Sequence, residues 1–120
     1  MPTRERVQAF IDRVVSGAHV EAIEEFYTED SSMQENLNPP RQGRDVLTEG
    51  ERRALARVKE MRTRPVTRFA IEGDIVFINW IFDAVQQDGA VKTLDEIAVQ
   101  EWRGDRIWRE RFYYDPKAFT

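Results

Sequence analysis

The sequence predicts an α+β fold in which three N-terminal helices pack in the concave face of a curved antiparallel sheet. In the first half, apolar residues recur with the three-to-four-residue spacing of amphipathic helices. The second half instead carries runs rich in β-branched and aromatic residues, separated by short turns. Because these turns are too short to hold crossover helices, the runs must form an antiparallel meander. Helices followed by strands is the order of an α+β fold.

Three segments of the first half are predicted to be helical. Residues 3–16 carry apolar side chains on one face, and Gly17 is suited to the left-handed conformation that ends a helix. A shorter helix is expected at about 19–27 and a third at about 44–60. Within the third, Gly50 costs roughly 1 kcal/mol relative to alanine, and close packing is an equally good reason for a glycine there.

Five segments are predicted to be strands. A short strand at 31–37 is stopped by Pro39 and Pro40, which cannot donate to a ladder. The four runs of the meander are residues 65–71, 75–85, 91–102 and 107–115. Since neither linkers nor repeats interrupt the chain, residues 1–120 are expected to form a single domain.

Composition excludes several classes of function. A net charge of −4 argues against nucleic-acid binding, which needs a basic face. The absence of cysteine excludes disulfides, thiol catalysis and cysteine metal sites. No apolar run is long enough to span a membrane and the N-terminus lacks a signal-peptide core, so we expect no membrane partner and a cytoplasmic protein.

The strand at 31–37 contains the first candidate for catalysis. Met33 and Glu35 share parity, so an apolar side chain and a carboxylate face the same way. If that face is the interior, Glu35 is costly to ionise and useful for proton transfer. The alternative is a structural glutamate that is hydrogen-bonded to the helices or points outward at the rim.

The order of these elements resembles the cone-shaped nuclear transport factor 2-like superfamily. The residues that carry the resemblance are Phe26-Tyr27-Thr28-Glu29-Asp30, Pro39-Pro40-Arg41-Gln42-Gly43-Arg44-Asp45, Trp102-Arg103-Gly104-Asp105-Arg106-Ile107 and Arg111-Phe112-Tyr113-Tyr114-Asp115. The pattern is most similar to SnoaL-like proteins and limonene epoxide hydrolase, and more distantly to ketosteroid isomerase. This superfamily hosts enzymes, binding proteins and dimerisation modules.

The resemblance implies a pocket inside the cone, between the helices and the sheet. The residues that it places in this pocket are Met33, Glu35, Trp80, Phe82, Glu96, Ala98, Glu110, Phe112 and Tyr114. Only Glu35 is polar among the positions matching the epoxide-opening residues of limonene epoxide hydrolase, so that machinery is not present. Glu35 also stands where ketosteroid isomerase has its base, whereas Phe10 or Ile11 and Ala98 stand where that enzyme has its oxyanion donors.

Two further carboxylates are candidates for the same chemistry. If Glu96 and Glu110 face the pocket together with Glu35, the like charges cannot all ionise and at least one group stays protonated as a donor. The alternative is that both point outward and pair across strands with Arg109 or Arg111. A shift of one residue in the strand register would turn both glutamates from the pocket face to the outer face, so the register decides between the two possibilities.

Aromatic residues of the meander suit a flat hydrophobic ligand, although they could equally form a filled core. These residues are Trp80, Trp102, Phe112 and Tyr114. Among these residues Tyr114 is the best candidate for a ligand contact, because a buried phenol needs a hydrogen-bond partner. The single histidine, His19, is expected on the surface at a helix start. We therefore predict no metal and no cofactor.

The run 75–85 is apolar on both faces, and one face must meet the helices. We therefore expect a homodimer through the outer face of the sheet. The predicted function is small-molecule binding, with acid/base catalysis of an isomerisation, cyclisation or dehydration of a hydrophobic carbonyl compound by Glu35. The alternative is a non-catalytic ligand-binding or dimerisation module of the same fold.

Overall fold

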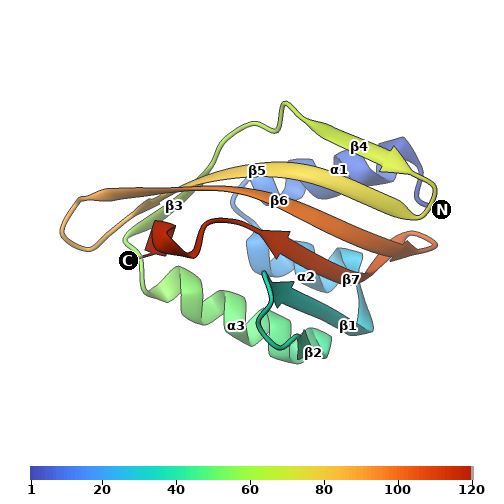
Figure 1. Cartoon of the computed structure of the whole chain (residues 1–120), viewed down its shortest axis with the longest axis horizontal. Helices are drawn as coiled ribbons and strands as arrows, with labels where there is room; N and C mark the ends of the chain where they lie inside the picture. The colour runs from blue at the N-terminus through green and yellow to red at the C-terminus, as the bar shows by residue number, and fades with distance from the viewer. Residues whose placement is uncertain (120) are drawn as a thin grey trace.

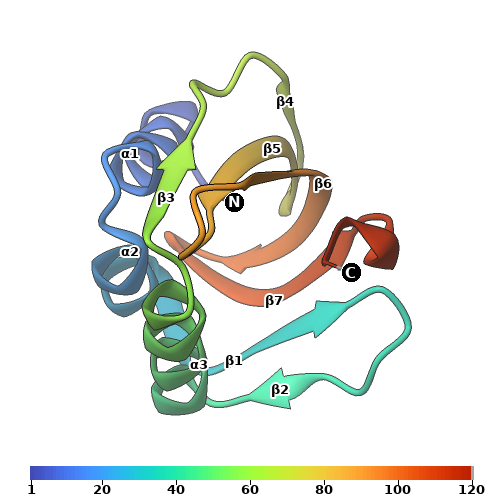
Figure 2. The same cartoon turned by 90° about the vertical axis from the view of Figure 1, so that its left-hand side faces the viewer.

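A computed structural model describes residues 1–119 of the chain (Figure 1). The helices are α1 (Arg4–Val15), α2 (His19–Phe26), α3 (Arg44–Ala56) and the short 3-10 helix η1 (Pro116–Phe119). The strands are β1 (Tyr27–Glu35), β2 (Arg41–Gln42), β3 (Glu60–Thr63), β4 (Phe69–Glu72), β5 (Ile75–Val85), β6 (Val91–Arg103) and β7 (Arg106–Tyr113). The three α-helices lie along the concave side of the sheet (Figure 2), so the predicted α+β cone is confirmed.

The seven strands form one curved, unclosed sheet in the order β2-β1-β7-β6-β5-β3, and β4 pairs with the other part of β5. All pairs are antiparallel except β1 with β7, which run parallel, so the sheet is mixed and not purely antiparallel. Local patterns predicted both strands but not that they pair with each other, because 70 residues lie between them. The parallel register places Met33 beside Glu110 and Glu35 beside Phe112.

Several predicted boundaries differ from the structure. The third helix ends at Ala56 and not near residue 60, and the missed strand β3 follows it. The strand expected at 65–71 begins only at Phe69. Pro65, shortly after the end of β3, has no N–H group to donate and so does not continue the ladder. β1 starts at Tyr27, earlier than expected. Its pairing with β7 shifts register between Tyr27 and Ser32, so buried and exposed side chains do not alternate regularly in this part of the sequence.

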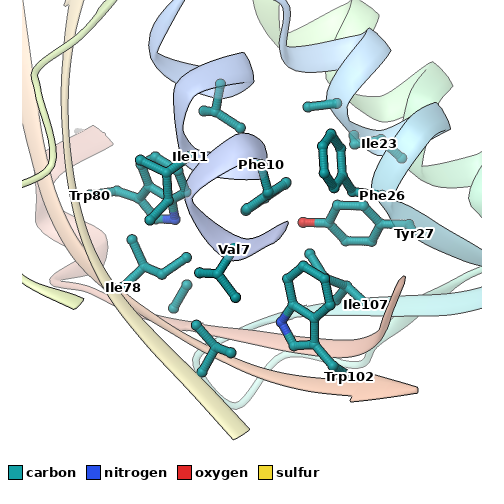
Figure 3. Close-up of a cluster of buried hydrophobic side chains, with 14 of the residues drawn as sticks. Val7, Phe10, Ile11, Ile23, Phe26, Tyr27, Ile78, Trp80, Trp102 and Ile107 are labelled. Carbon is teal, nitrogen blue, oxygen red and sulfur yellow. The ribbon is translucent and has the colours of Figure 1, made fainter. Parts of the chain in front are cut away.

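The core is centred on Phe10 of α1, which reaches across to the sheet (Figure 3). Its ring makes edge contacts with Phe26, Tyr27, Trp80 and Trp102, at centroid separations of 5.4–6.2 Å. The phenyl ring is 2% exposed. One helix side chain therefore joins α2, β1, β5 and β6, and edge-to-face packing of this kind adds to the free energy gained by burying the rings.

Within residues 1–119, none of the helices has the length and apolar character needed to cross a bilayer. The cytoplasmic location expected from the sequence stays a prediction.

Replacing Phe10 with alanine should lower the free energy of unfolding by about 3–5 kcal/mol, because it removes a fully packed ring and leaves a cavity. Urea denaturation followed by circular dichroism measures the change. The matched control is Leu37→Ala, whose side chain is 84% exposed and whose loss should cost no more than about 0.5 kcal/mol. Equal costs for the two substitutions would contradict the central place of Phe10.

Candidate functional site

A cavity of about 490 Å³ lies between the helices and the concave face of the sheet. Most of the exposed wall is apolar, and its apolar side chains include Phe10, Ile23, Met33, Trp80, Phe82 and Phe112. Polar and charged side chains also line it, among them Glu35, Arg41, Glu96 and Glu110. A cavity of this size, mostly apolar with few convergent polar groups, is typical of small-molecule sites.

Glu110 lies at the inner end of the cavity and is 3% exposed. Its Oε1 accepts a hydrogen bond from the Tyr27 hydroxyl, and its Oε2 accepts one of 2.6 Å from Gln100 Nε2. The orientation of the Gln100 amide is fixed in turn, because Trp102 Nε1 donates to Gln100 Oε1 at 3.0 Å. These four side chains form a buried chain of hydrogen bonds that ends on a carboxylate.

Burial raises the pKa of Glu110 to about 7, although the bonds from Gln100 and Tyr27 act in the opposite direction by stabilising the charged form. The negative charges of Glu35 and Glu51 raise it further. For Tyr27, burial raises the pKa of the phenol well above its usual range, and the charge of Glu110 adds to this effect. The phenol therefore stays protonated and remains a donor to Glu110.

Glu96 lines the cavity from β6 and is 6% exposed. Among residues 1–119, no side chain or backbone group forms a hydrogen bond or ion pair with its carboxyl group. Burial raises the pKa of Glu96 to about 8, and the charges of Glu110, Glu35 and Glu51 raise it further. Near neutral pH the group is therefore mainly protonated. A buried carboxylic acid without a protein partner faces the space where a ligand would lie.

Glu35 has a different environment. Its side chain is 30% exposed and lines the cavity, and both carboxylate oxygens accept hydrogen bonds from Arg41 Nη2, at 2.8 and 3.0 Å. The sequence predicts that an interior Glu35 is costly to ionise. The structure instead supplies a cation to its carboxylate from β2, only six residues away along the chain.

The position of Arg41 depends on the glycine in α3. A Cβ atom on Gly50 would lie 3.0 Å from Arg41 Nη1, which is closer than ordinary van der Waals contact. Gly50 therefore leaves room for the guanidinium that holds Glu35. Of the two reasons offered for this glycine, the close approach is the one that the structure supports.

The structure divides the remaining predicted residues into two groups. Met33, Trp80, Phe82 and Phe112 line the cavity. Trp102 and Tyr114 do not belong to that wall, which corrects their predicted place. Trp102 is 2% exposed within the core. For Tyr114, partial burial and the nearby charges of Glu35 and Glu96 raise the pKa of the phenol, which places it close to the carboxylates.

His19 is buried, and its predicted surface position is wrong. The imidazole is 8% exposed and lines the cavity, with Nδ1 3.3 Å from Glu51 Oε1 and Nε2 2.9 Å from Thr63 Oγ1. The missed strand β3 supplies Thr63, so its partner could not be identified. A signal was nevertheless present, since His19 lies three and four residues before Ala22 and Ile23 on the buried face of α2.

Other polar residues of the site also escaped sequence reasoning. They are Tyr27, Arg41, Glu51, Arg57, Lys92 and Gln100. In the part of the chain that the structure describes, no group of three or more histidine, aspartate or glutamate side chains is placed to hold a metal ion. The site therefore combines an apolar cavity with two buried carboxyl groups, Glu96 and Glu110, whose pKa values are raised.

A curved sheet wrapped around three helices, with a cavity between them, places the chain in the nuclear transport factor 2-like superfamily. Residues 7–110 match the family model described as the SnoaL-like domain. Because this match spans most of the sequence, the chain belongs to the SnoaL-like family. No curated protein matches the chain significantly.

Three similar solved structures illustrate the range of this fold. A candidate SnoaL-like polyketide cyclase from Mesorhizobium loti is 21% identical, with 95% of this chain and 100% of that chain covered and a TM-score of 0.78. An epoxide hydrolase of the limonene type from Mycobacterium tuberculosis is 17% identical, with 95% and 83% covered and a TM-score of 0.76.

The third has a ketosteroid isomerase-like fold, comes from Catenulispora acidiphila and is in complex with trimethylamine; it is 18% identical, with 97% and 89% covered and a TM-score of 0.80. At these identities the likeness shows the fold and not the reaction.

Stability should fall as pH rises from about 5 to about 9. The pKa values of folded Glu96 and Glu110 are raised to about 8 and about 7, so between these values and the ordinary glutamate range the folded state binds more protons than the unfolded state. Their stabilising contribution is present below the unfolded pKa and is lost as pH rises through the folded pKa. Urea denaturation at a series of pH values measures this dependence.

Glu96→Gln should flatten this dependence, because the amide cannot ionise in the cavity. The matched control is Glu101→Gln on the same strand, whose side chain points to the opposite face of the sheet and should leave the slope unchanged. A wild-type protein whose stability rises over this pH range would contradict the burial of ionisable carboxyl groups.

Proposed function

We propose that this protein catalyses a proton-transfer reaction, such as isomerisation, cyclisation or dehydration, on a small and largely apolar carbonyl compound bound in the cone. The cavity volume and aromatic wall suit such a compound. The observation that carries the proposal is the carboxyl group of Glu96, which is buried, has no partner and faces the cavity. Such a group can donate a hydrogen bond to a carbonyl oxygen at neutral pH.

Glu110 is the proposed base, which complements the acid Glu96. Its carboxylate is held by Tyr27 and Gln100 and titrates near pH 7, so a large fraction is ionised at neutral pH. In the proposed step Glu110 removes a proton from the carbon next to the carbonyl, while Glu96 transfers its proton to the carbonyl oxygen. The product is an enol. Glu110 then delivers its proton to a different carbon while the enol hydroxyl returns its proton to Glu96, which completes an isomerisation and restores both carboxyl groups.

Glu35 was the sequence candidate for proton transfer. Because both of its oxygens are occupied by Arg41, the geometry favours Glu96 and Glu110 for this role. Glu35 then acts through its charge, which raises the pKa values of both Glu96 and Glu110. We therefore treat Glu35 as a positioning residue of the proposed site.

The conversion of 3-cyclohexenone to its conjugated isomer, followed by ultraviolet absorbance, tests the proposal. Wild-type protein should exceed the buffer rate, and Glu96→Gln should reduce the catalysed rate by about 10²–10⁴-fold, the usual contribution of a general acid. The control Glu101→Gln should retain the wild-type rate. Deuterium exchange at the acidic carbon of a 1,3-diketone provides a second readout that does not require isomerisation.

The pH profile of this reaction has an expected shape. Activity should rise as the base with a pKa of about 7 loses its proton and fall as the acid with a pKa of about 8 loses its own, which gives a narrow bell. Glu110→Gln should lower the rate, because the amide cannot accept the proton, and the activity that remains should lack the acidic limb. Absence of activity in both assays, or a wild-type rate in Glu96→Gln, would contradict the proposed function.

A second candidate function is ligand binding without catalysis. Phe10 and Ala98 are buried and apolar where the resemblance to ketosteroid isomerase would require oxyanion donors. A cavity that bound small apolar carbonyl compounds but failed both proton-transfer assays would support this alternative.

We also propose that the chain forms a homodimer through the outer face of its sheet. Phe77, Ile97 and Tyr113 are 40–42% exposed there, and Ile97 lies directly opposite Tyr113 in the register of β6 and β7. Exposed apolar side chains on neighbouring strands are typical of a covered interface.

Analytical ultracentrifugation tests this association. Wild-type protein should sediment as a dimer, and Ile97→Lys should shift it to monomer, because a buried lysine at the centre of an apolar interface is strongly unfavourable. Leu37→Lys, in the exposed loop after β1, is the matched control and should remain dimeric. A monomeric wild-type protein would rule out the dimer.

A further inference from the structure

Four segments gather at one end of the cone: the carboxyl end of α3, β3, the β5–β6 hairpin and η1 (Figure 2). Each contributes to the wall of the cavity, through residues that include Arg57, Met61, Lys92 and Ala118. The opposite end is filled by the aromatic cluster around Phe10. We call the gathered end the mouth of the cavity.

Two cations stand at this mouth. Lys92 has the same strand parity as Glu96, which places it on the concave face, and it lies opposite Ala84 of β5. Arg57 is the residue that caps α3. Within residues 1–119 neither side chain has an ion pair or a hydrogen bond, in contrast to Arg41, which is paired with Glu35.

The charges change sign along the cavity. Glu96 and Glu110 lie toward the interior together with Glu35, whereas Lys92 and Arg57 lie at the mouth. At neutral pH Glu96 is mainly protonated and Glu35 is paired with Arg41, so a ligand anion is kept from the inner end by the ionised fraction of Glu110 and by the cost of burying a charge there. Lys92 and Arg57 attract the anion to the mouth. The field orients any ligand that carries an anion, with the apolar part inward and the anion outward.

We infer that the ligand of this cavity is an amphipathic organic acid: an apolar, ring-sized body that bears a single anionic group, with a carboxylate as the biological form. Lys92 and Arg57 bind the anion at the mouth, and the body lies against Trp80 and Phe82. Glu96 lies four positions after Lys92, a backbone distance of about 13 Å along a strand, which leaves room for a body of about two rings.

This inference rests on the proposed function for the placement of the reacting carbonyl near Glu96. The anion site itself is tested by binding alone, so that a failure of catalysis and a failure of anion recognition are distinguishable. If the protein recognises the anion but transfers no proton, only the proposed function fails.

Two fluorescent dyes that differ by one anionic group provide the test. 1-Anilinonaphthalene-8-sulfonate carries a sulfonate, and N-phenyl-1-naphthylamine has the same ring skeleton without it. Wild-type protein should bind the sulfonate dye more tightly than the neutral dye. The double variant Arg57→Met/Lys92→Met should lose about 10-fold in affinity for the sulfonate dye, the size of a charge-assisted contact, and keep its affinity for the neutral dye.

Two variants sharpen the result. Lys92→Arg keeps the charge and should retain sulfonate binding, and Lys59→Met removes a nearby exposed cation outside the cavity wall and should change nothing. A wild-type protein that binds both dyes equally or binds neither would overturn the inference. It would also fail if the double variant kept its sulfonate affinity, or lost affinity for both dyes to the same extent.

Discussion

The contact of Phe10 with four aromatic rings determines where the cone is filled and where it is hollow. α1 inserts this one side chain between the sheet and α2, and the rings of Phe26, Tyr27, Trp80 and Trp102 surround it. Packing at this density leaves no room for a ligand at that end. The cavity extends toward the other end, where the carboxyl end of α3 and the β5–β6 hairpin form its mouth, and Phe10 itself forms part of its inner wall.

The same cluster supports a buried polar network. Trp102 donates to Gln100, and this orients the amide so that its nitrogen faces Glu110. A buried carboxylate is costly unless it accepts hydrogen bonds, and Glu110 accepts two. Glu96 accepts none from the described chain, so its burial is compensated only by keeping its proton or by a ligand. Sites that depart from the usual satisfaction of polar groups are often functional.

The sequence predicted the helices and the meander, because these depend on local periodicity. It left open whether Glu96 and Glu110 face the pocket or point outward, because a shift of one residue in a strand reverses the face. It could not predict the pairing of β1 with β7, the strand β3 or the buried position of His19, which depend on contacts between distant segments. Arg41 was quoted only as part of a family motif. Its partnership with Glu35 needed the short turn that brings β2 back alongside β1.

The ion pair of Glu35 and Arg41 lies beside α3 and also affects the carboxyl groups of the site. The guanidinium binds both oxygens of Glu35, and the absence of a side chain on Gly50 lets it approach α3 closely. Burial is the main cause of the raised pKa values of Glu96 and Glu110, and the negative charge held on Glu35 adds to it. In the proposed reaction, a carboxylate that does not itself transfer the proton therefore helps to keep a neighbouring carboxyl group protonated. Since Coulomb interactions act over several ångströms in an apolar cavity, Glu35 can influence the chemistry without contacting the reacting atoms.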